Sequence, residues 1–374
     1  MRGLAWERIG LSMERKPTPI EVAFCTDAGY VPQLAAALVS LFKSNWQNSL
    51  SISVVTTELS ESNRHALEKL ALTYGRSLQF YDLNVESLRG LAEYAQPKST
   101  YYRLLLPDLL QHIPKLIYLD CDLVVEIDLE PLWQTELNGA LVVGVAERDS
   151  LQPGLQAHVL TPGDPYINAG VLAMNLQAWR DEGVARQCLE WLQANPTIAT
   201  MMDQDAINHV CRGRKAYVPD RWNLNPIHGP AREVLPNYPE RVLHFAGPIK
   251  PWHAWYCQDL ADIFFQYMRQ TSGPFFVTIK PPSTTGQHLS VANQAYERES
   301  YKESAIHYQL VAMQLIKIYP TDTYTIIQCY NSAQIGMNAK DYVASSDNFR
   351  AVIAQWGLPT THTDIYRIPG IRTQ

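Results

Sequence analysis

The sequence has no long apolar run and no concentration of basic residues, and each absence excludes a class of protein. No apolar stretch approaches the roughly 20 residues that cross a membrane as a helix, so we expect no transmembrane segment. Lysine and arginine total 31 against 37 aspartates and glutamates, for a formal net charge of −6. Because a nucleic-acid-binding surface needs clustered basic residues, we expect no nucleic-acid partner either.

Cysteine is also sparse, and the six cysteines are scattered without a Cys-x-x-Cys pair. This spacing favours free thiols in a reducing compartment over a disulfide framework or a zinc site. Residues 1–17 are interpreted as a polar leader, because they lack the apolar core of a secretory signal. The sequence thus predicts a cytoplasmic protein, with peripheral attachment to the inner face of the membrane as a further option.

What the chain does contain is the composition of an ordinary globular protein, with 46% hydrophobic and 18% charged residues. Its 374 residues predict two domains. Apolar runs typical of strands alternate with segments of helical apolar spacing. The expected strands are 20–26, 50–57, 77–83 and 115–119, and the expected helices are 31–42 and one capped by Ser60. This alternation predicts an α/β sheet with a parallel portion, in which ligands bind beyond the carboxyl ends of the strands.

A change of character near residue 271 predicts a second, smaller domain. Residues 271–287 contain Pro-Pro, Gly, Ser and Thr, and are interpreted as a linker after a first domain at 18–270. Residues 288–374 are expected to be helical and weakly resemble tetratricopeptide repeats, whose period is about 34 residues. A plain helical extension packed on the first domain is the alternative. A helical-hairpin domain of this kind would offer a surface for a protein partner.

The most informative short stretch is KLIYLDCDLVV (Lys115–Val125), in which an apolar run ends in two aspartates. Side chains alternate across an extended strand, so Asp120 and Asp122 can point at one place while Cys121 turns to the other side. Two carboxylates aimed at one point repel unless a cation lies between them, and hard divalent ions prefer oxygen ligands. The simpler alternative is that each aspartate caps a turn or faces water.

Two enzyme classes place Asp-x-Asp after an apolar strand. In phosphatases of the haloacid-dehalogenase type the first aspartate is the nucleophile, and the pair stands near the start of the domain. Here about a hundred residues of expected α/β structure precede the pair, which argues against that class. In nucleotide-sugar glycosyltransferases the pair binds a metal ion that bridges the donor diphosphate. A non-catalytic protein that binds a partner through a decayed transferase fold is the third hypothesis.

Three later segments contain residues that suit the glycosyltransferase class. They are YINAGVLAMNLQAW (Tyr166–Trp179), MDQDAINH (Met202–His209) and VLHFAGPIKPWH (Val242–His253). Each has an ordinary explanation when it is taken alone. Acidic residues at the start of a helix suit its dipole, a lone histidine after a strand is usually structural, and a lysine in a Gly-Pro loop is usually solvated. Their joint occurrence is more informative than any one of them.

Taken in order, the segments resemble glycosyltransferase family 8, the group that includes glycogenin and the bacterial lipopolysaccharide galactosyl- and glucosyltransferases. The resemblance covers roughly residues 18–270. It is carried by FCTDAGY (24–30), STYYRLLLPDLL (99–110), IYLDCDLVV (117–125), DLEPLW (128–133), YINAGVLAMNLQAWR (166–180), DQDAIN (203–208) and HFAGPIKPWH (244–253). The resemblance implies a GT-A fold, a Rossmann-like nucleotide-sugar-binding α/β domain. It also implies transfer of a hexose from a UDP-sugar with retention of configuration.

By the same resemblance, Asp120, Asp122 and His244 look like metal ligands. An imidazole beside two carboxylates suits manganese, with magnesium as the alternative. Asp203 and Gln204 resemble the catalytic residues beneath the donor sugar. The residues that resemble donor contacts are Thr26, Asp27, Tyr30, Ser99, Thr100, Arg103, Asp120, Cys121, Asp122, Asn168, Ala169, Gly247 and Lys250.

Some features depart from the family pattern or are left open by the sequence. Many relatives carry Asp-Asn where Ala28 and Gly29 follow the first-strand aspartate, which weakens the uridine assignment there. The choice between double displacement and same-face attack is open, because the reach of Asp203 and Asp205 is not visible in a sequence. The sugar, glucose or galactose, and the acceptor, a glycan, a lipid-linked glycan or a protein, are open as well.

Overall fold

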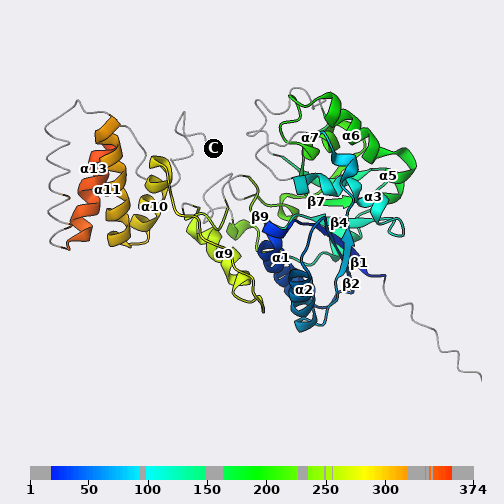
Figure 1. The fold of residues 1–374 in the computed structure, drawn as a ribbon, viewed down its shortest axis with the longest axis horizontal. Helices are drawn as coiled ribbons and strands as arrows, with labels where there is room; N and C mark the ends of the chain where they lie inside the picture. The colour runs from blue at the N-terminus through cyan, green and yellow to red at the C-terminus, as the bar shows by residue number, and fades with distance from the viewer. Residues whose placement is uncertain are drawn as a thin grey trace, which may run out of the picture.

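The computed structural model describes residues 18–91, 98–147, 163–225, 235–247, 250–254, 256–318, 333, 337 and 340–355. The predicted leader at 1–17 and part of the predicted helical region, including 319–332 and 356–374, lie outside the described residues. Figure 1 shows an α/β body on the right and three C-terminal helices on the left. These helices are α10 (Thr285–Glu297), α11 (Tyr301–Ile318) and α13 (Tyr342–Gln355).

Within the described residues, the body is built on a seven-stranded sheet in the order β3-β2-β1-β4-β7-β6-β8. The first four strands in this order run parallel, whereas β7 runs antiparallel to both β4 and β6. A separate two-stranded sheet pairs β5 with β9. The strands are β1 (Ile20–Cys25), β2 (Leu50–Thr56), β3 (Gln79–Asp82), β4 (Leu116–Leu119), β5 (Leu123–Glu126), β6 (Val142–Ala146), β7 (Ile167–Met174), β8 (Lys215–Tyr217) and β9 (Arg241–His244). The predicted α/β class with a parallel portion is confirmed.

Helices cover both faces of this sheet, with α1 and α2 on one side and α5, α6 and α7 on the other (Figure 1). Among the described residues, the helices are too short or too polar to cross a bilayer. The helices of the body are α1 (Val31–Ser44), α2 (Glu61–Thr73), α3 (Leu106–Leu109), α4 (Glu130–Trp133), α5 (Leu176–Glu182), α6 (Val184–Ala194), α7 (Asp203–Val210) and α9 (Gln258–Met268). Short 3-10 helices are η1 (Ala28–Tyr30), η2 (Glu86–Leu88), η3 (Lys98–Leu105), η5 (Asp220–Trp222) and η7 (Leu235–Asn237).

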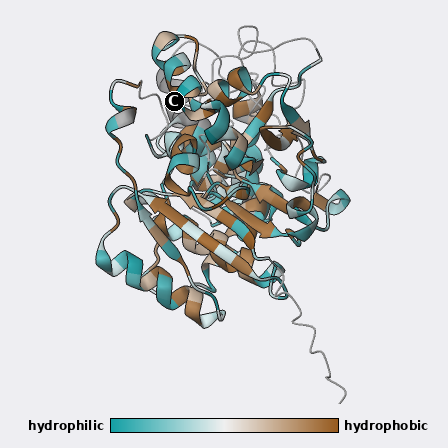
Figure 2. Cartoon of the chain, turned by 90° about the vertical axis from the view of Figure 1, so that its right-hand side faces the viewer, coloured by the Kyte–Doolittle hydropathy of each residue, from teal (hydrophilic) through white to brown (hydrophobic). Residues whose placement is uncertain are grey.

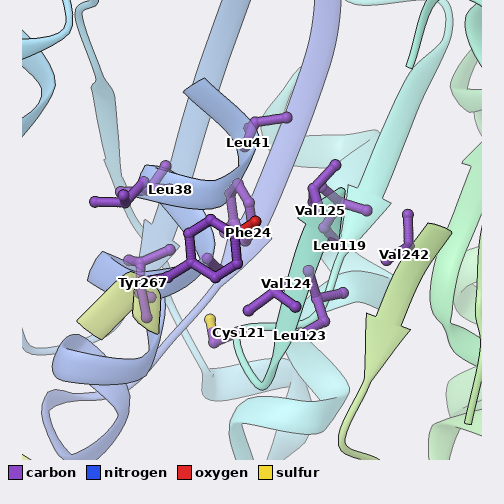
Figure 3. Packing of buried hydrophobic residues seen from close by; sticks show 14 of the residues in the cluster. Phe24, Leu38, Leu41, Leu119, Cys121, Leu123, Val124, Val125, Val242 and Tyr267 are labelled. Carbon is purple, nitrogen blue, oxygen red and sulfur yellow. The ribbon is translucent and has the colours of Figure 1, made fainter. Parts of the chain in front are cut away.

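Strand β1 shows how the sequence fills the core on both faces. Val22 and Phe24 belong to the core that α1 covers, whereas Ala23 and Cys25 belong to the core on the opposite face. A strand buried on both faces needs a nearly continuous apolar run, and in IEVAFC the partly exposed Glu21 is the single charged residue. Figure 2 shows the strands as predominantly hydrophobic, and Figure 3 shows Phe24 beside Leu38 of α1.

Two strand pairings bring distant polar residues to one edge of the sheet. Strands β1 and β4 are parallel neighbours with Phe24 opposite Leu119, so the residues after both strands lie at the same edge. Strand β5 begins directly after the Asp-x-Asp segment and pairs antiparallel with β9, with Leu123 opposite His244. The pairing therefore places His244 beside Asp122, although the two are far apart in the sequence.

The C-terminal helices α10, α11 and α13 pack around a small core of their own, which includes Tyr308 and Phe349. Helix α10 begins inside the predicted linker 271–287, with a capping box formed by Thr284 and Gln287. Before it, the Lys280 N–H donates to the carbonyl of Trp252 at 2.9 Å and joins the segment to the body. The helical character of the described part is confirmed, while the tetratricopeptide resemblance and the domain boundaries stay predictions.

Replacing Asn45 with alanine tests a buried polar link between the end of α1 and the segment after β5. Asn45 is 1% exposed, accepts from the Leu129 N–H at 2.8 Å and donates to the Ile127 carbonyl at 3.1 Å. Asn45→Ala leaves these buried groups unpaired, so we expect the free energy of unfolding to fall by about 1–3 kcal/mol in urea denaturation. Gln134→Ala, at an exposed position, is the control with almost no change, and equal losses would contradict the interpretation.

Candidate functional site

The carboxylates of Asp120 and Asp122, the aspartate pair, converge on the imidazole of His244. Nε2 of His244 lies 3.6 Å from Oδ2 of Asp120 and 3.4 Å from Oδ1 of Asp122. Ligand atoms of the three residues all lie within 4.8 Å of one another. In the described part of the chain, this is the one group of three or more histidine, cysteine or acidic side chains with such spacing. We use the name metal cluster for these three side chains, which are the candidate ligands of one cation.

The donor set and the spacing of the metal cluster fit a divalent cation. Adjacent ligands of an octahedral ion with bonds of about 2.1 Å lie about 3 Å apart, close to the separations found here. Gly170 borders the same space, and a Cβ atom there would lie 2.1 Å from Cε1 of His244 and 2.9 Å from Oδ2 of Asp120. The absence of a side chain at Gly170 therefore leaves room for the His244 ring and the Asp120 carboxylate to lie close to this backbone. Two carboxylates and an imidazole suit a hard or borderline divalent ion.

Lys250 pairs with Asp122. Its ammonium group donates to the Asp122 carboxylate and, at 3.0 Å, to the carbonyl of Phe245. Burial alone would raise the pKa of Asp122, but the ammonium group of Lys250 opposes burial, and this pKa lies well below its ordinary value. The carboxylate is therefore ionised at neutral pH, which metal ligation requires.

Asp120 is held by Tyr118 and Arg103. The Tyr118 hydroxyl donates to Oδ1 of Asp120 at 2.6 Å, and Nη2 of Arg103 lies 3.1 Å from the same oxygen. The guanidinium also lies over the Tyr118 ring, 4.6 Å from its centroid. Burial would lower the pKa of Arg103, but Asp120 and Asp203 raise it. The guanidinium thus stays charged, and the other oxygen of Asp120 is the one nearest His244.

Arg103 also connects the aspartate pair to the start of α7. Its Nε lies 2.9 Å from Oδ2 of Asp203 but donates to the Thr100 carbonyl, so the contact with Asp203 is a charge pair without a hydrogen bond. The guanidinium donates to the carbonyl of Ala169, and the Ala169 N–H donates to Oε1 of Gln204 at 2.9 Å. Burial raises the pKa of Asp203 to about 7, against the opposing effect of Arg103. The predicted catalytic residues are therefore joined to the metal cluster through Arg103.

The structure distinguishes Asp203 from Asp205, which the sequence leaves as alternatives. Both oxygens of Asp205 are used within the fold: Tyr166 donates its hydroxyl to Oδ1 at 2.6 Å, and the Met201 N–H donates to Oδ2 at 2.8 Å. Asp205 is fully buried. These contacts give Asp205 a structural role in the packing of α7.

The predicted uridine contacts lie at the same edge of the sheet. Oδ1 of Asp27 accepts from the Gly29 N–H at 2.8 Å, and Oδ2 accepts from the Ser99 hydroxyl at 2.7 Å. The ring of Tyr30 meets Trp252 edge-on, with the centroids 6.0 Å apart. Burial raises the pKa of Tyr30, so its hydroxyl stays protonated. The structure thus brings together predicted residues from η1 and η3.

Three other predicted donor contacts have different surroundings. Cys121 donates its thiol to the Cys25 carbonyl at 3.2 Å and lies in the apolar core (Figure 3), so its side chain takes no part in the metal cluster. Thr26 is buried and donates its hydroxyl to the Asp27 carbonyl. Gly247 has a φ of 91°, a left-handed conformation that favours glycine.

A chain of side-chain amides lies behind His244. Oδ1 of Asn223 is 2.8 Å from Nδ1 of His244, and Nδ2 of Asn223 donates to Oδ1 of Asn168 at 2.9 Å. Nδ2 of Asn168 in turn donates to Oε1 of Glu147 at 2.7 Å. The amide chain borders a small hollow that is lined by Val145, Ala146, Glu147, Asn168, Asp220, Asn223, Leu224 and Asn225.

Two residues of the site, Tyr118 and Asn223, lie outside the set predicted from the sequence. Tyr118 could have been identified, because it is two residues before Asp120 and strand alternation puts both on one face. Asn223 carries no such signal, since no periodic pattern in DRWNLN marks it. Asn168 belongs to the predicted set as a donor contact, and the structure adds its hydrogen bond to Asn223.

A protein-family model matches this chain over more than half of its length. The sequence model described as Glycosyl transferase family 8 matches residues 21–256. Lipopolysaccharide 1,2-glucosyltransferase of Escherichia coli (strain K12) is 25% identical over 248 residues, covering 63% of this chain and 73% of that protein. General stress protein A of Bacillus subtilis (strain 168) is 23% identical over 274 residues, covering 69% of this chain and 96% of that protein.

Among solved structures, galactosyltransferase LgtC in complex with donor and acceptor sugar analogs is similar to this chain. Its TM-score is 0.61 at 27% identity, and the match covers 68% of this chain and 96% of that one. The GT-A fold expected from the family resemblance is thereby confirmed. The family match spans the whole metal cluster, which assigns the Asp-x-Asp segment to the glycosyltransferase hypothesis and not to the phosphatase one.

Gly170→Ala tests whether close approach to this glycine holds the His244 ring in place. Because the new Cβ would overlap the ring, we expect the nuclear magnetic resonance signals of the His244 imidazole to move. Gly144→Ala in the neighbouring strand is the control, since a Cβ there would meet Leu172 at 3.1 Å and no part of the metal cluster. Unchanged His244 signals in Gly170→Ala would contradict the geometry.

Proposed function

The chain belongs to glycosyl transferase family 8, and from this premise we propose that it is a metal-dependent, retaining hexosyltransferase. It transfers glucose or galactose from a UDP-sugar to a glycan, a lipid-linked glycan or a protein. The observation that carries the proposal is the convergence of Asp120, Asp122 and His244 at one sheet edge. Asp27 follows the adjacent strand at that edge, and Lys250 adds a positive charge beside Asp122.

The metal cluster would hold the cation through two carboxylate oxygens and Nε2 of the imidazole. Since an imidazole ligand suits manganese better than magnesium, manganese is the proposed ion and magnesium the alternative. When bound by these three residues, a divalent ion would supply positive charge to offset the charge on the departing nucleoside diphosphate. The contacts of Arg103 and Tyr118 keep Asp120 in its position before the donor arrives.

Lys250 would bind the donor diphosphate. Its ammonium group is shared between Asp122 and the Phe245 carbonyl, so it already lies beside the metal cluster. From this position the ammonium would be able to reach a phosphate oxygen and place a positive charge beside the leaving group. Gly247, in a conformation open mainly to glycine, would let the backbone of this loop come close to the diphosphate.

The uridine would lie against the ends of β1 and η3. Tyr30 and Trp252 meet edge-on and do not stack on each other. The face of the Tyr30 ring could therefore stack against the uracil base. Asp27 and Ser99, which are hydrogen-bonded to each other, offer polar partners for the base and ribose. Thr26 and Thr100 flank these residues and would shape the same pocket.

Retention of configuration requires either a carboxylate nucleophile or attack on the same face of the sugar. Asp203 is 2% exposed, lies against Arg103, and has a pKa raised by burial to about 7. At neutral pH part of the Asp203 carboxyl is therefore protonated, and burial against a guanidinium restricts its access to the sugar; both effects argue against Asp203 as the nucleophile. We therefore favour same-face attack, with Asp203 and Gln204 positioning the reacting sugar. Ala169 and Asn168 border the same place, since the Ala169 N–H fixes Gln204.

The acceptor and the location are proposed from separate observations. Relatives named as lipopolysaccharide glucosyltransferases support a lipid-linked glycan as the first acceptor class to test. Helices α10, α11 and α13 are the proposed surface for a protein partner. A cytoplasmic location, with access to the inner face of the membrane, is supported by the free thiols of Cys25, Cys121, Cys188, Cys211 and Cys257.

A donor screen tests the proposed activity. With manganese and no acceptor, UDP-glucose or UDP-galactose should be hydrolysed slowly, and UDP release should stop when the metal is chelated. Absence of UDP release with every common donor would contradict the proposal. That result, together with binding of a protein partner by the full chain, would favour the non-catalytic alternative.

Asp122→Asn tests the metal cluster directly. Because the amide is a neutral and weaker ligand, we expect manganese-dependent UDP release to fall by about 100-fold or more. Glu130→Gln, which changes an acidic residue at the start of α4, is the matched control and should keep full activity. Equal activity of Asp122→Asn and Glu130→Gln would show that the Asp122 carboxylate is not needed for UDP release.

A further inference from the structure

The direction of the amide chain behind His244 is fixed by two anchors at Asn168. The backbone N–H of Gly170, which can only donate, meets Oδ1 of Asn168 at 2.9 Å. The carboxylate of Glu147, an acceptor, meets Nδ2 of Asn168 at 2.7 Å. Both anchors require the same orientation, with the amide oxygen toward Gly170 and the amide nitrogen toward Glu147.

The orientation of the Asn168 amide determines that of Asn223, which in turn determines the tautomer of His244. Since Oδ1 of Asn168 accepts, the atom of Asn223 that lies 2.9 Å away must be the amide nitrogen. The amide oxygen of Asn223 then lies 2.8 Å from Nδ1 of His244. An oxygen at this distance requires an N–H on Nδ1. In the neutral ring Nε2 therefore carries a lone pair, and this is the atom between the two aspartates.

Without the amide chain, the neighbouring charges would favour the opposite tautomer. The carboxylates of Asp120 and Asp122 lie 3.6 and 3.4 Å from Nε2 of His244, and both attract an N–H there. A ring protonated on Nε2 cannot bind a cation through that nitrogen. Asn223 is 5% exposed and His244 3% exposed, so bulk water is kept from replacing the amide as the partner of Nδ1.

We propose that Asn168 and Asn223 are positioning residues that hold His244 in the Nδ1–H tautomer and so keep Nε2 available as a metal ligand. This proposal rests on the metal-dependent function proposed above. The ring nitrogen that does not ligate the metal is commonly fixed by a hydrogen bond of this kind, and loss of such a bond weakens metal binding. Here the side chain of Asn223 holds His244, and Asn223 is itself oriented by Asn168, whose amide oxygen accepts from the backbone N–H of Gly170.

Two variants of Asn223 separate hydrogen bonding from packing. Asn223→Leu keeps a similar side-chain volume and removes the acceptor, whereas Asn223→Asp keeps an oxygen opposite Nδ1. In the full-length, metal-free protein at alkaline pH, the nitrogen chemical shifts of isotope-labelled His244 report which ring nitrogen carries the proton. We expect the Nδ1–H tautomer in the native protein and in Asn223→Asp, and the Nε2–H tautomer in Asn223→Leu. A role in packing alone would leave the tautomer of Asn223→Leu unchanged.

Manganese binding gives a second readout that does not depend on turnover. In an electron paramagnetic resonance titration with UDP present, we expect Asn223→Leu to bind Mn²⁺ about 10- to 100-fold more weakly than the native protein. Asn45→Ala, which removes a buried asparagine at the end of α1, is the matched control and should keep the native affinity.

The Nδ1–H tautomer in Asn223→Leu, or native Mn²⁺ affinity in that variant, would overturn the proposal. If the three residues do not form a metal site, the result is different, because the native protein would then bind no Mn²⁺ at this site. In that case the tautomer measured in the metal-free protein still decides whether Asn223 orients His244.

Discussion

Two carboxylates held at the end of one strand repel each other, and the site depends on the positive groups that offset this repulsion. Arg103 lies against Asp120, and Lys250 lies against Asp122. These two cations come from η3 and from the loop after β9. Charges in a buried setting interact more strongly than in water, so both segments contribute to holding the aspartate pair in place.

Backbone pairing supplies the precision that these side chains need. The pairing of β5 with β9 sets His244 opposite Leu123, one residue after Asp122. The pairing of β4 with β7 continues one residue further, because the Asp120 N–H donates to the Gly170 carbonyl at 2.8 Å. A shift of one residue in either strand pairing would turn the side chains of that strand to the opposite face. His244 and the aspartate pair would then no longer lie together. The same ladders that build the core therefore set the spacing of the metal cluster.

Local patterns predicted much of the fold, because apolar runs such as IEVAFC report burial directly. Strand alternation predicted that the aspartate pair shares a face while Cys121 turns to the other side, where the structure shows it in the core, and alternation could also have identified Tyr118. The role of Asn223 could not be predicted in this way. Its contacts reach His244 and Asn168 across 21 and 55 residues of sequence, and such contacts exist only after the sheet has formed.

The proposed function requires that the aspartate pair and His244 form one divalent metal site that serves a UDP-sugar. The most direct test is a crystal of the chain grown with UDP and manganese, with diffraction recorded at a wavelength where manganese scatters anomalously. We expect one manganese peak about 2.2 Å from ligand atoms of Asp120, Asp122 and His244, with the diphosphate of UDP beside it. Manganese bound by other side chains, or UDP bound with no manganese at this cluster, would contradict it.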